Sequence, residues 1–153
     1  MMRMETFQTV AHIAAVNGWV LHQVDIKTAF LRGKIEPGEE VYMNQPKGFE
    51  AKGQEGCIWE LQKGLYGLLQ AGHIWNKAMN QGMLSLGFTW IKCEYCLYFC
   101  QTEAGTLLTG IHVDDFFLAA SCLIQVGNFK QLASIWEISD LGEATFCIDI
   151  AIE

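Results

Sequence analysis

Apolar side chains recur with helical spacing in two segments of the chain. Over residues 6–17 they lie three or four positions apart, and Asn17-Gly18 supplies a C-terminal stop, so this segment is predicted to be a helix. A second helix is predicted over 70–86, where Gly87 ends the pattern. Its apolar stripe consists of Trp75, Met79, Met83 and Leu86. A third helix is expected over 124–136.

Alternation with a period of two predicts a strand over residues 19–26. Side chains of a strand point alternately to its two faces. One face then carries Val20, Val24 and Ile26, and the other carries Leu21, Gln23 and Asp25. The strand therefore delivers Asp25 to the face opposite the apolar one, near its end.

Shorter strands are expected elsewhere in the chain. A turn or short helix over 27–33 and an acidic turn over 36–40 precede the first of them, and 47–56 reads as a loop. The later strands form hairpins, with a first turn at 102–105 and a second reversal at Asp114-Asp115. The expected strands cover 41–43, 57–61, 96–100, 106–113, 116–120 and 144–152. This mixture predicts one α+β domain over residues 1–153, with an antiparallel sheet against which helices pack.

Composition and charge limit the classes of function that the chain can have. The chain has 153 residues, is 51% hydrophobic and 18% charged, and contains no run as apolar as the ~20 residues of a membrane helix. No secretory signal follows the N-terminus, so an intracellular protein, not secreted and without a membrane partner, is expected. A net charge of −7 and only ten Lys plus Arg argue against a free-standing nucleic-acid binder. They leave open a catalytic piece whose basic surfaces lie on other segments.

The pair Asp114-Asp115 interrupts an apolar run that extends from about residue 107 to residue 120. Burial of two ionised carboxylates costs free energy unless a cation balances their charge. The pair therefore lies either at a solvent-exposed hairpin turn or in a cleft beside a cation. Asp25 occupies a similar setting and converges with the pair if its strand lies beside the hairpin. Three carboxylates of this kind suit Mg²⁺, whereas three unrelated surface aspartates are the alternative. Spacing alone leaves both open.

Five sequence blocks resemble those of copia-type retrotransposon reverse transcriptases and occur in the family's order. They are Val24–Gly33, Val41–Phe49, Leu65–Ala71 with Trp75, Val113–Asp115, and Asp140–Ala144. Each block is weak evidence alone, but five in order over nearly the whole chain are specific. The resemblance implies a polymerase palm-like sheet, with part of the fingers included, in a domain truncated relative to the family.

The resemblance also implies roles for individual residues. Asp25 and Asp114 would be the principal ligands of two catalytic Mg²⁺ ions, for which Mn²⁺ can substitute, and Asp115 would be a supporting carboxylate. Phe30 matches the aromatic residue that lies under the incoming sugar and favours deoxynucleotides. Gln70 matches a glutamine that helps to hold the incoming nucleotide. Otherwise Phe30 is a core aromatic and Gln70 a polar residue at a helix start.

The implied function is RNA-directed DNA polymerisation by nucleotidyl transfer onto a primer 3′-hydroxyl. The implied partners are primer-template nucleic acid, deoxynucleoside triphosphates and the integrase and RNase H segments of a polyprotein. Cytoplasmic virus-like particles or the nucleus would be its location.

Several residues depart from the family pattern. Leu69 replaces a usual Lys, Gly72-His73 replaces Pro-Arg, and His112 replaces an aromatic residue before Val-Asp-Asp. Two cations are thereby lost beside the expected nucleotide pocket, and neutralisation of triphosphate charge is a large part of phosphoryl-transfer catalysis. The alternative function is therefore a non-catalytic, degenerate retroelement fragment, acting as a scaffold or without function.

Overall fold

The structure is a computed structural model that describes residues 2–147 and 150–152. The chain divides into two compact units. One unit comprises Met1–Ala29 with Asn80–Glu153, and the other comprises Phe30–Met79.

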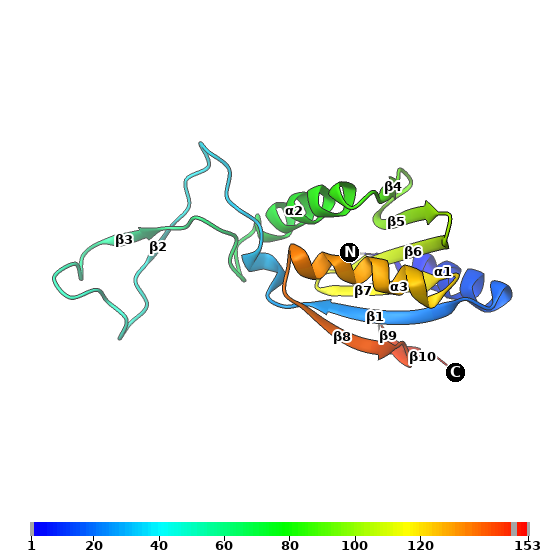
Figure 1. The fold of residues 1–153 in the computed structure, drawn as a ribbon. Helices are drawn as coiled ribbons and strands as arrows, with labels where there is room; N and C mark the ends of the chain where they lie inside the picture. Colours follow the sequence, from blue (N-terminus) through cyan, green and yellow to red (C-terminus); the bar gives the residue numbers. More distant parts are fainter. Residues whose placement is uncertain (1, 148–149, 153) are drawn as a thin grey trace. The chain divides into compact units, whose positions relative to one another are not determined.

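A six-stranded antiparallel sheet forms the centre of the first unit, with the strand order β4-β5-β6-β7-β1-β8 (Figure 1). Consecutive strands β4 to β7 are neighbours, as expected for hairpins. The N-terminal strand β1 then inserts between β7 and β8, which brings into register residues that are 90 to 100 positions apart for β7 and 112 to 121 positions apart for β8. The strands are β1 (Val20–Ile26), β4 (Thr89–Ile91), β5 (Glu94–Thr102), β6 (Gly105–His112), β7 (Asp115–Ala120) and β8 (Ile138–Glu143).

Helices cover both faces of this sheet (Figure 1). Helix α1 (Met4–Asn17) packs on one face, where the ring of Phe7 lies 4.6 Å from that of Phe117. Helix α3 (Leu123–Phe129), continued by the 3₁₀ helix η2 (Lys130–Ser134), covers the other, with Phe129 5.6 Å from Phe116. Because adjacent residues of a strand point to opposite faces, the Phe116-Phe117 pair anchors one helix on each side.

Helix α1 ends where its sequence predicts and begins two residues earlier than predicted, at Met4. Phe7, Val10 and Ala14 form its buried stripe. Gly18 adopts a left-handed conformation with φ of 63°, and its N–H donates to the carbonyl oxygens of Ala14 and Ala15. Glycine adopts this conformation without steric penalty, which explains the clean helix end.

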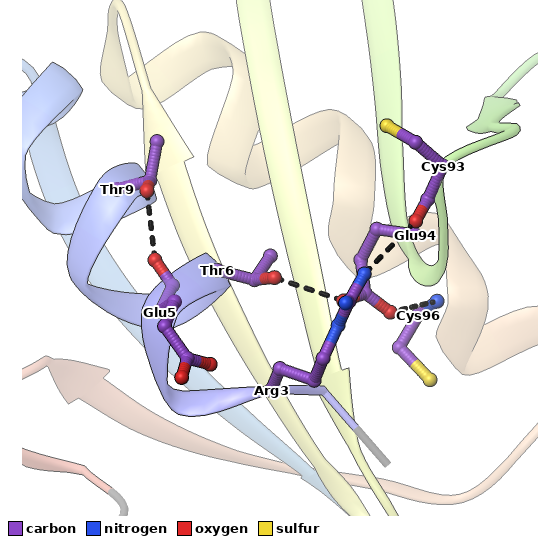
Figure 2. A network of polar contacts seen from close by, with 7 residues as sticks. All are labelled: Arg3, Glu5, Thr6, Thr9, Cys93, Glu94 and Cys96. Carbon is purple, nitrogen blue, oxygen red and sulfur yellow. Dashed lines mark hydrogen bonds and ion pairs between the residues drawn. The ribbon is translucent and has the colours of Figure 1, made fainter.

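A buried carboxylate ties the start of α1 to β5 (Figure 2). Glu94 accepts hydrogen bonds from Arg3 Nε at 2.9 Å and from Thr6 Oγ1 at 2.8 Å. Arg3 also donates from Nη2 to the carbonyl oxygen of Cys93. Burial favours the protonated form of Glu94, but these bonds and that from the Cys96 N–H outweigh burial and lower its pKa. The first turn of α1 is thereby fixed to the β4–β5 end of the sheet.

The second unit contains a short hairpin and the start of a helix. Strand β2 (Tyr42–Asn44) pairs with β3 (Ile58–Glu60), and η1 (Ala29–Leu31) leads into the unit from β1. Helix α2 (Ala71–Ser85) begins in this unit, and its residues from Asn80 onward belong to the first. Gly33 lies against the helix, since a Cβ there would be 2.5 Å from Ile74 Cγ2.

The predicted fold class, α+β with an antiparallel sheet and packed helices, is confirmed. The segments predicted as 6–17, 19–26 and 70–86 correspond to α1, β1 and α2. No helix among residues 2–147 and 150–152 is long and apolar enough to cross a membrane.

Three boundary predictions are wrong. The reversal expected at Asp114-Asp115 is a two-residue turn at Val113-Asp114, and Asp115 already belongs to β7. The helix expected over 124–136 ends at Phe129 and continues as 3₁₀ turns. The single last strand expected over 144–152, of which 148–149 lie outside the described residues, is instead the two short strands β9 (Phe146–Cys147) and β10 (Ile150–Ala151), and they are preceded by β8, a strand that was not predicted.

The sequence of β8 lacks the pattern that would predict a strand. Among the residues that the structure describes, it pairs only with β1, at an edge of the sheet; it shifts register opposite Gln23 and Val24, and it contains Gly142 with φ of 83°. A half-exposed, irregular edge strand lacks the apolar alternation on which the prediction relied.

Substitution of Gly82 by alanine should destabilise the first unit. A Cβ on this residue of α2 would lie 2.3 Å from Cη2 of the buried Trp136 ring. Overpacking of a core typically costs about 1–3 kcal/mol of unfolding free energy, which chemical denaturation measures. Gly72→Ala in the same helix is the control, because a Cβ there meets nothing within 4 Å. Equal stability of the two variants would contradict the tight contact.

The Glu94 network should make stability depend on pH. The folded-state pKa of Glu94 lies below its ordinary value of 4.5, so its contribution is present above that pH and is lost as pH falls through the folded pKa. Glu94→Gln should therefore reduce stability by about 2 kcal/mol at pH 7, and the gap to wild type should close below pH 4.5. Thermal melts from pH 7 to pH 3 measure this, with the exposed turn variant Glu103→Gln as control.

Candidate active site

Three strands of the first unit bring His112, Asp115 and Asp25 into one row. Asp25 at the end of β1 lies directly opposite Asp115 at the start of β7, and Asp115 lies opposite His112 at the end of β6. Residues that face each other across antiparallel strands share one face and have Cβ atoms about 5 Å apart. The register of the sheet therefore brings Asp25 next to Asp115, as the sequence predicted.

The β6–β7 turn supplies the third carboxylate. Val113 and Asp114 form the turn, and Val113 has a φ of 58°. A positive φ at the first central residue is typical of a type II′ hairpin turn, where glycine is the usual residue and a β-branched side chain is strained. The Ile26 N–H donates to the Asp114 carbonyl oxygen at 2.8 Å, so the turn is tied to the end of β1 beside Asp25.

The three carboxylates act on one another electrostatically. Burial raises the pKa of Asp25 above its ordinary 3.8, and the charges of Asp115 and Asp114 raise it further, whereas Lys27 partly offsets them. All three aspartates are half-buried. A raised carboxyl pKa means that the ionised form is disfavoured, so the site concentrates negative charge that a cation would neutralise.

Gln23 adds a contact that the sequence analysis did not anticipate. Its Nε2 donates to Oδ1 of Asp115 at 3.1 Å. The alternation of β1 predicted that Gln23 shares a face with Asp25, but it gave no partner across the sheet. Only the β1–β7 register, which sets Gln23 opposite Phe117, brings its amide within reach of Asp115 two residues away.

A polar cluster on the other face holds the edge strand β8. Asp140 Oδ1 lies 2.6 Å from His22 Nε2 and accepts the Gly142 N–H, and Oδ2 lies 2.5 Å from Lys130 Nζ. The bonds from Lys130 and His22 lower the pKa of Asp140 to about 2, against a smaller opposing effect of burial. The cluster joins β1, β8 and η2, so the Asp140 block has a structural role beside the site.

The three carboxylates fit a divalent cation whose remaining coordination positions are filled by a bound substrate. Among residues 2–147 and 150–152, no group of three or more His, Cys, Asp or Glu side chains is arranged to hold a metal ion by itself. Mg²⁺, however, is usually bound through one or two carboxylates, with waters and substrate phosphates completing its shell. The facing pair Asp25 and Asp115, with Asp114 beside it, provides hard oxygen donors of this kind.

The two residues expected at the nucleotide lie in the second unit. Phe30 in η1 is half-buried and packs edge-on against Tyr66, with ring centroids 4.8 Å apart. Gln70 directly precedes α2, and its carbonyl oxygen accepts the Ile74 N–H. Their roles toward a nucleotide remain predictions.

His112 stands where the resemblance implies an aromatic residue. It is half-buried, and its Nδ1 finds no hydrogen-bond partner within the part of the chain that the structure describes. This departure therefore lies in the row of carboxylates itself, opposite Asp115.

Comparison with known proteins assigns the chain to a family. The family described as reverse transcriptase (RNA-dependent DNA polymerase) matches residues 1–153. The retrovirus-related Pol polyprotein from transposon TNT 1-94 of Nicotiana tabacum is 33% identical over 144 residues, which are 93% of this chain and 11% of that protein. The putative transposon Ty5-1 protein of Saccharomyces cerevisiae is 35% identical over 121 residues, 78% of this chain and 39% of that protein.

A further relative, the retrovirus-related Pol polyprotein from transposon RE1 of Arabidopsis thaliana, is 28% identical over 146 residues, 95% of this chain and 10% of that protein. No solved structure matches the chain. The chain thus spans about a tenth of the length of the Pol polyproteins it matches. The resemblance to copia-type elements is confirmed, and the chain belongs to the reverse transcriptase family.

Proposed function

We propose that this chain contributes the catalytic carboxylates of an RNA-directed DNA polymerase of a copia-type retrotransposon. The observation that carries the proposal is the convergence of Asp25, Asp114 and Asp115, which the antiparallel β1–β7 pairing and the Val113-Asp114 turn bring together. In the proposed reaction a primer 3′-hydroxyl attacks the α-phosphate of a deoxynucleoside triphosphate, and pyrophosphate leaves.

The aspartates would hold two divalent cations, Mg²⁺ or Mn²⁺. Such ions activate the attacking oxygen and stabilise the leaving one in polymerases. Asp25 and Asp114 would be the principal ligands and Asp115 the supporting one. The raised pKa of Asp25 supports this assignment, because three mutually repelling carboxylates gain most from a bound cation.

The resemblance also assigns roles toward the nucleotide to two residues. Phe30 would lie under the incoming sugar and exclude a 2′-hydroxyl by its bulk, and Gln70 would hold the nucleotide. Primer-template nucleic acid and the integrase and RNase H segments of a polyprotein are the proposed partners.

The distribution of charge supports the need for further segments. The second unit carries equal numbers of cationic and acidic residues, so the entire net charge of −7 falls in the unit that contains the aspartates. A nucleic-acid duplex approaching that unit would be repelled without cations.

A non-catalytic retroelement fragment remains the second candidate. It is favoured by the replacement of two family cations at Leu69 and Gly72-His73 and by His112 in the carboxylate row. Both candidates share the same ancestry and fold, so only an activity measurement separates them.

Primer extension on an RNA template with Mg²⁺ or Mn²⁺ tests the proposed activity. We expect weak extension by the wild-type chain, because basic template-binding surface is scarce, and loss of that extension in Asp114→Asn. Glu103→Gln, in an exposed turn, should extend as wild type does. Extension that survives Asp114→Asn would contradict the assigned site, and no extension by wild type under any condition would favour the non-catalytic candidate.

Asp25→Asn should stabilise the folded chain. The folded-state pKa of Asp25 is raised, so the native state binds this proton more tightly than the unfolded state and loses stability as pH rises above 3.8. The neutral variant lacks this cost and should melt a few degrees higher at pH 7, with the gap closing toward pH 4. Addition of Mn²⁺ should raise the melting temperature of wild type more than that of the variant. A lower melting temperature for Asp25→Asn would contradict the repulsion among the carboxylates.

A further inference from the structure

Gln23 is a neutral hydrogen-bond donor beside one of the three carboxylates, Asp115. It lies on β1 two residues before Asp25 and on the same face, and its Nε2 reaches Asp115 Oδ1 at 3.1 Å. We propose that Gln23 is a positioning residue that fixes the orientation of Asp115 and leaves its second oxygen to a divalent cation. This inference rests on the proposed function, which assigns Asp115 a supporting role.

The packing of β1 makes Gln23 suited to this task. Its cross-strand partners are Phe117 on β7 and Gly142 on β8, and Phe117 is held by the ring of Phe7 from α1. Gln23 is half-buried in this row, so its side chain has less conformational freedom than that of an exposed residue. The row adjacent to the carboxylates is thus covered by α1, and Gln23 is its polar member.

The amide of Gln23 is neutral, which suits it to a place beside a cation-binding carboxylate. A lysine or arginine in this place would also orient Asp115, but it would neutralise the charge that attracts a cation and would compete with it. An amide donates a hydrogen bond and leaves the net charge of the site unchanged. Outer-shell donors of this kind orient ligating carboxylates, and their loss typically reduces metal affinity about 10- to 100-fold.

Mn²⁺ binding to the 153-residue chain, followed by electron paramagnetic resonance at pH 7, tests the proposal without relying on activity. Gln23→Leu should bind Mn²⁺ about tenfold more weakly than wild type while its circular dichroism and melting temperature stay close to wild type. Gln23→Lys should bind still more weakly, because its charge pairs with Asp115. Gln101→Leu is the matched control, since Gln101 is an exposed residue of β5, which is separated from β1 by two strands.

A double-mutant cycle shows whether Gln23 acts through Asp115. In an Asp115→Ala background, Gln23→Leu should have no further effect on Mn²⁺ affinity, whereas independent roles would give additive losses. The hydrogen bond between Gln23 and Asp115 can also be tested in the metal-free chain. Asp115→Ala should shift the side-chain amide resonances of Gln23 in a ¹⁵N–¹H spectrum. Unchanged resonances would overturn the inference.

The outcomes distinguish this inference from the proposed function. If wild type binds Mn²⁺ and Gln23→Leu binds it equally well, the positioning role is wrong and the metal site stands. If wild type binds no Mn²⁺, even at millimolar concentration, both the metal site and the role of Gln23 are overturned.

Discussion

The pairing of β1 with β7 is the interaction on which the rest of the first unit depends. It inserts an N-terminal strand beside a hairpin formed about ninety residues later, and it sets Asp25 opposite Asp115. The same register places Phe117 under α1 and Phe116 under α3, so the core on both faces and the carboxylate row follow from one alignment. A slip of one residue would turn Asp25 toward α3, and Val24 and Ile26 toward the face that now carries the carboxylates.

The same register places stabilising apolar side chains on one face of β1 and mutually repelling carboxylates on the other. Val24 and Ile26 are fully buried on one face of β1, while Asp25 between them faces two other carboxylates and has a raised pKa. The apolar face holds in place a charge arrangement that would not assemble by itself. Such a division is typical of functional sites, where local repulsion is maintained by the surrounding structure.

Polar contacts at the margins fix the elements that the core does not. Glu94 ties the start of α1 to β5, and Asp140 ties β8 to β1 and η2. Both carboxyl groups have lowered pKa values, in contrast to Asp25, because each faces cationic or neutral donors. The direction of the pKa shift therefore distinguishes Glu94 and Asp140, which stabilise the fold, from Asp25 in the candidate site.

The sequence by itself determined the strongly periodic elements α1, β1 and α2, the α+β class, the family and the three aspartates as candidates. Local patterns sufficed there, because periodicity and motifs are written in consecutive residues. Only the tertiary structure decided the position of the β6–β7 turn, the edge strand β8 and the partner of Gln23. Each depends on which strands lie side by side, and cross-strand register is set by packing between segments that are distant in the chain.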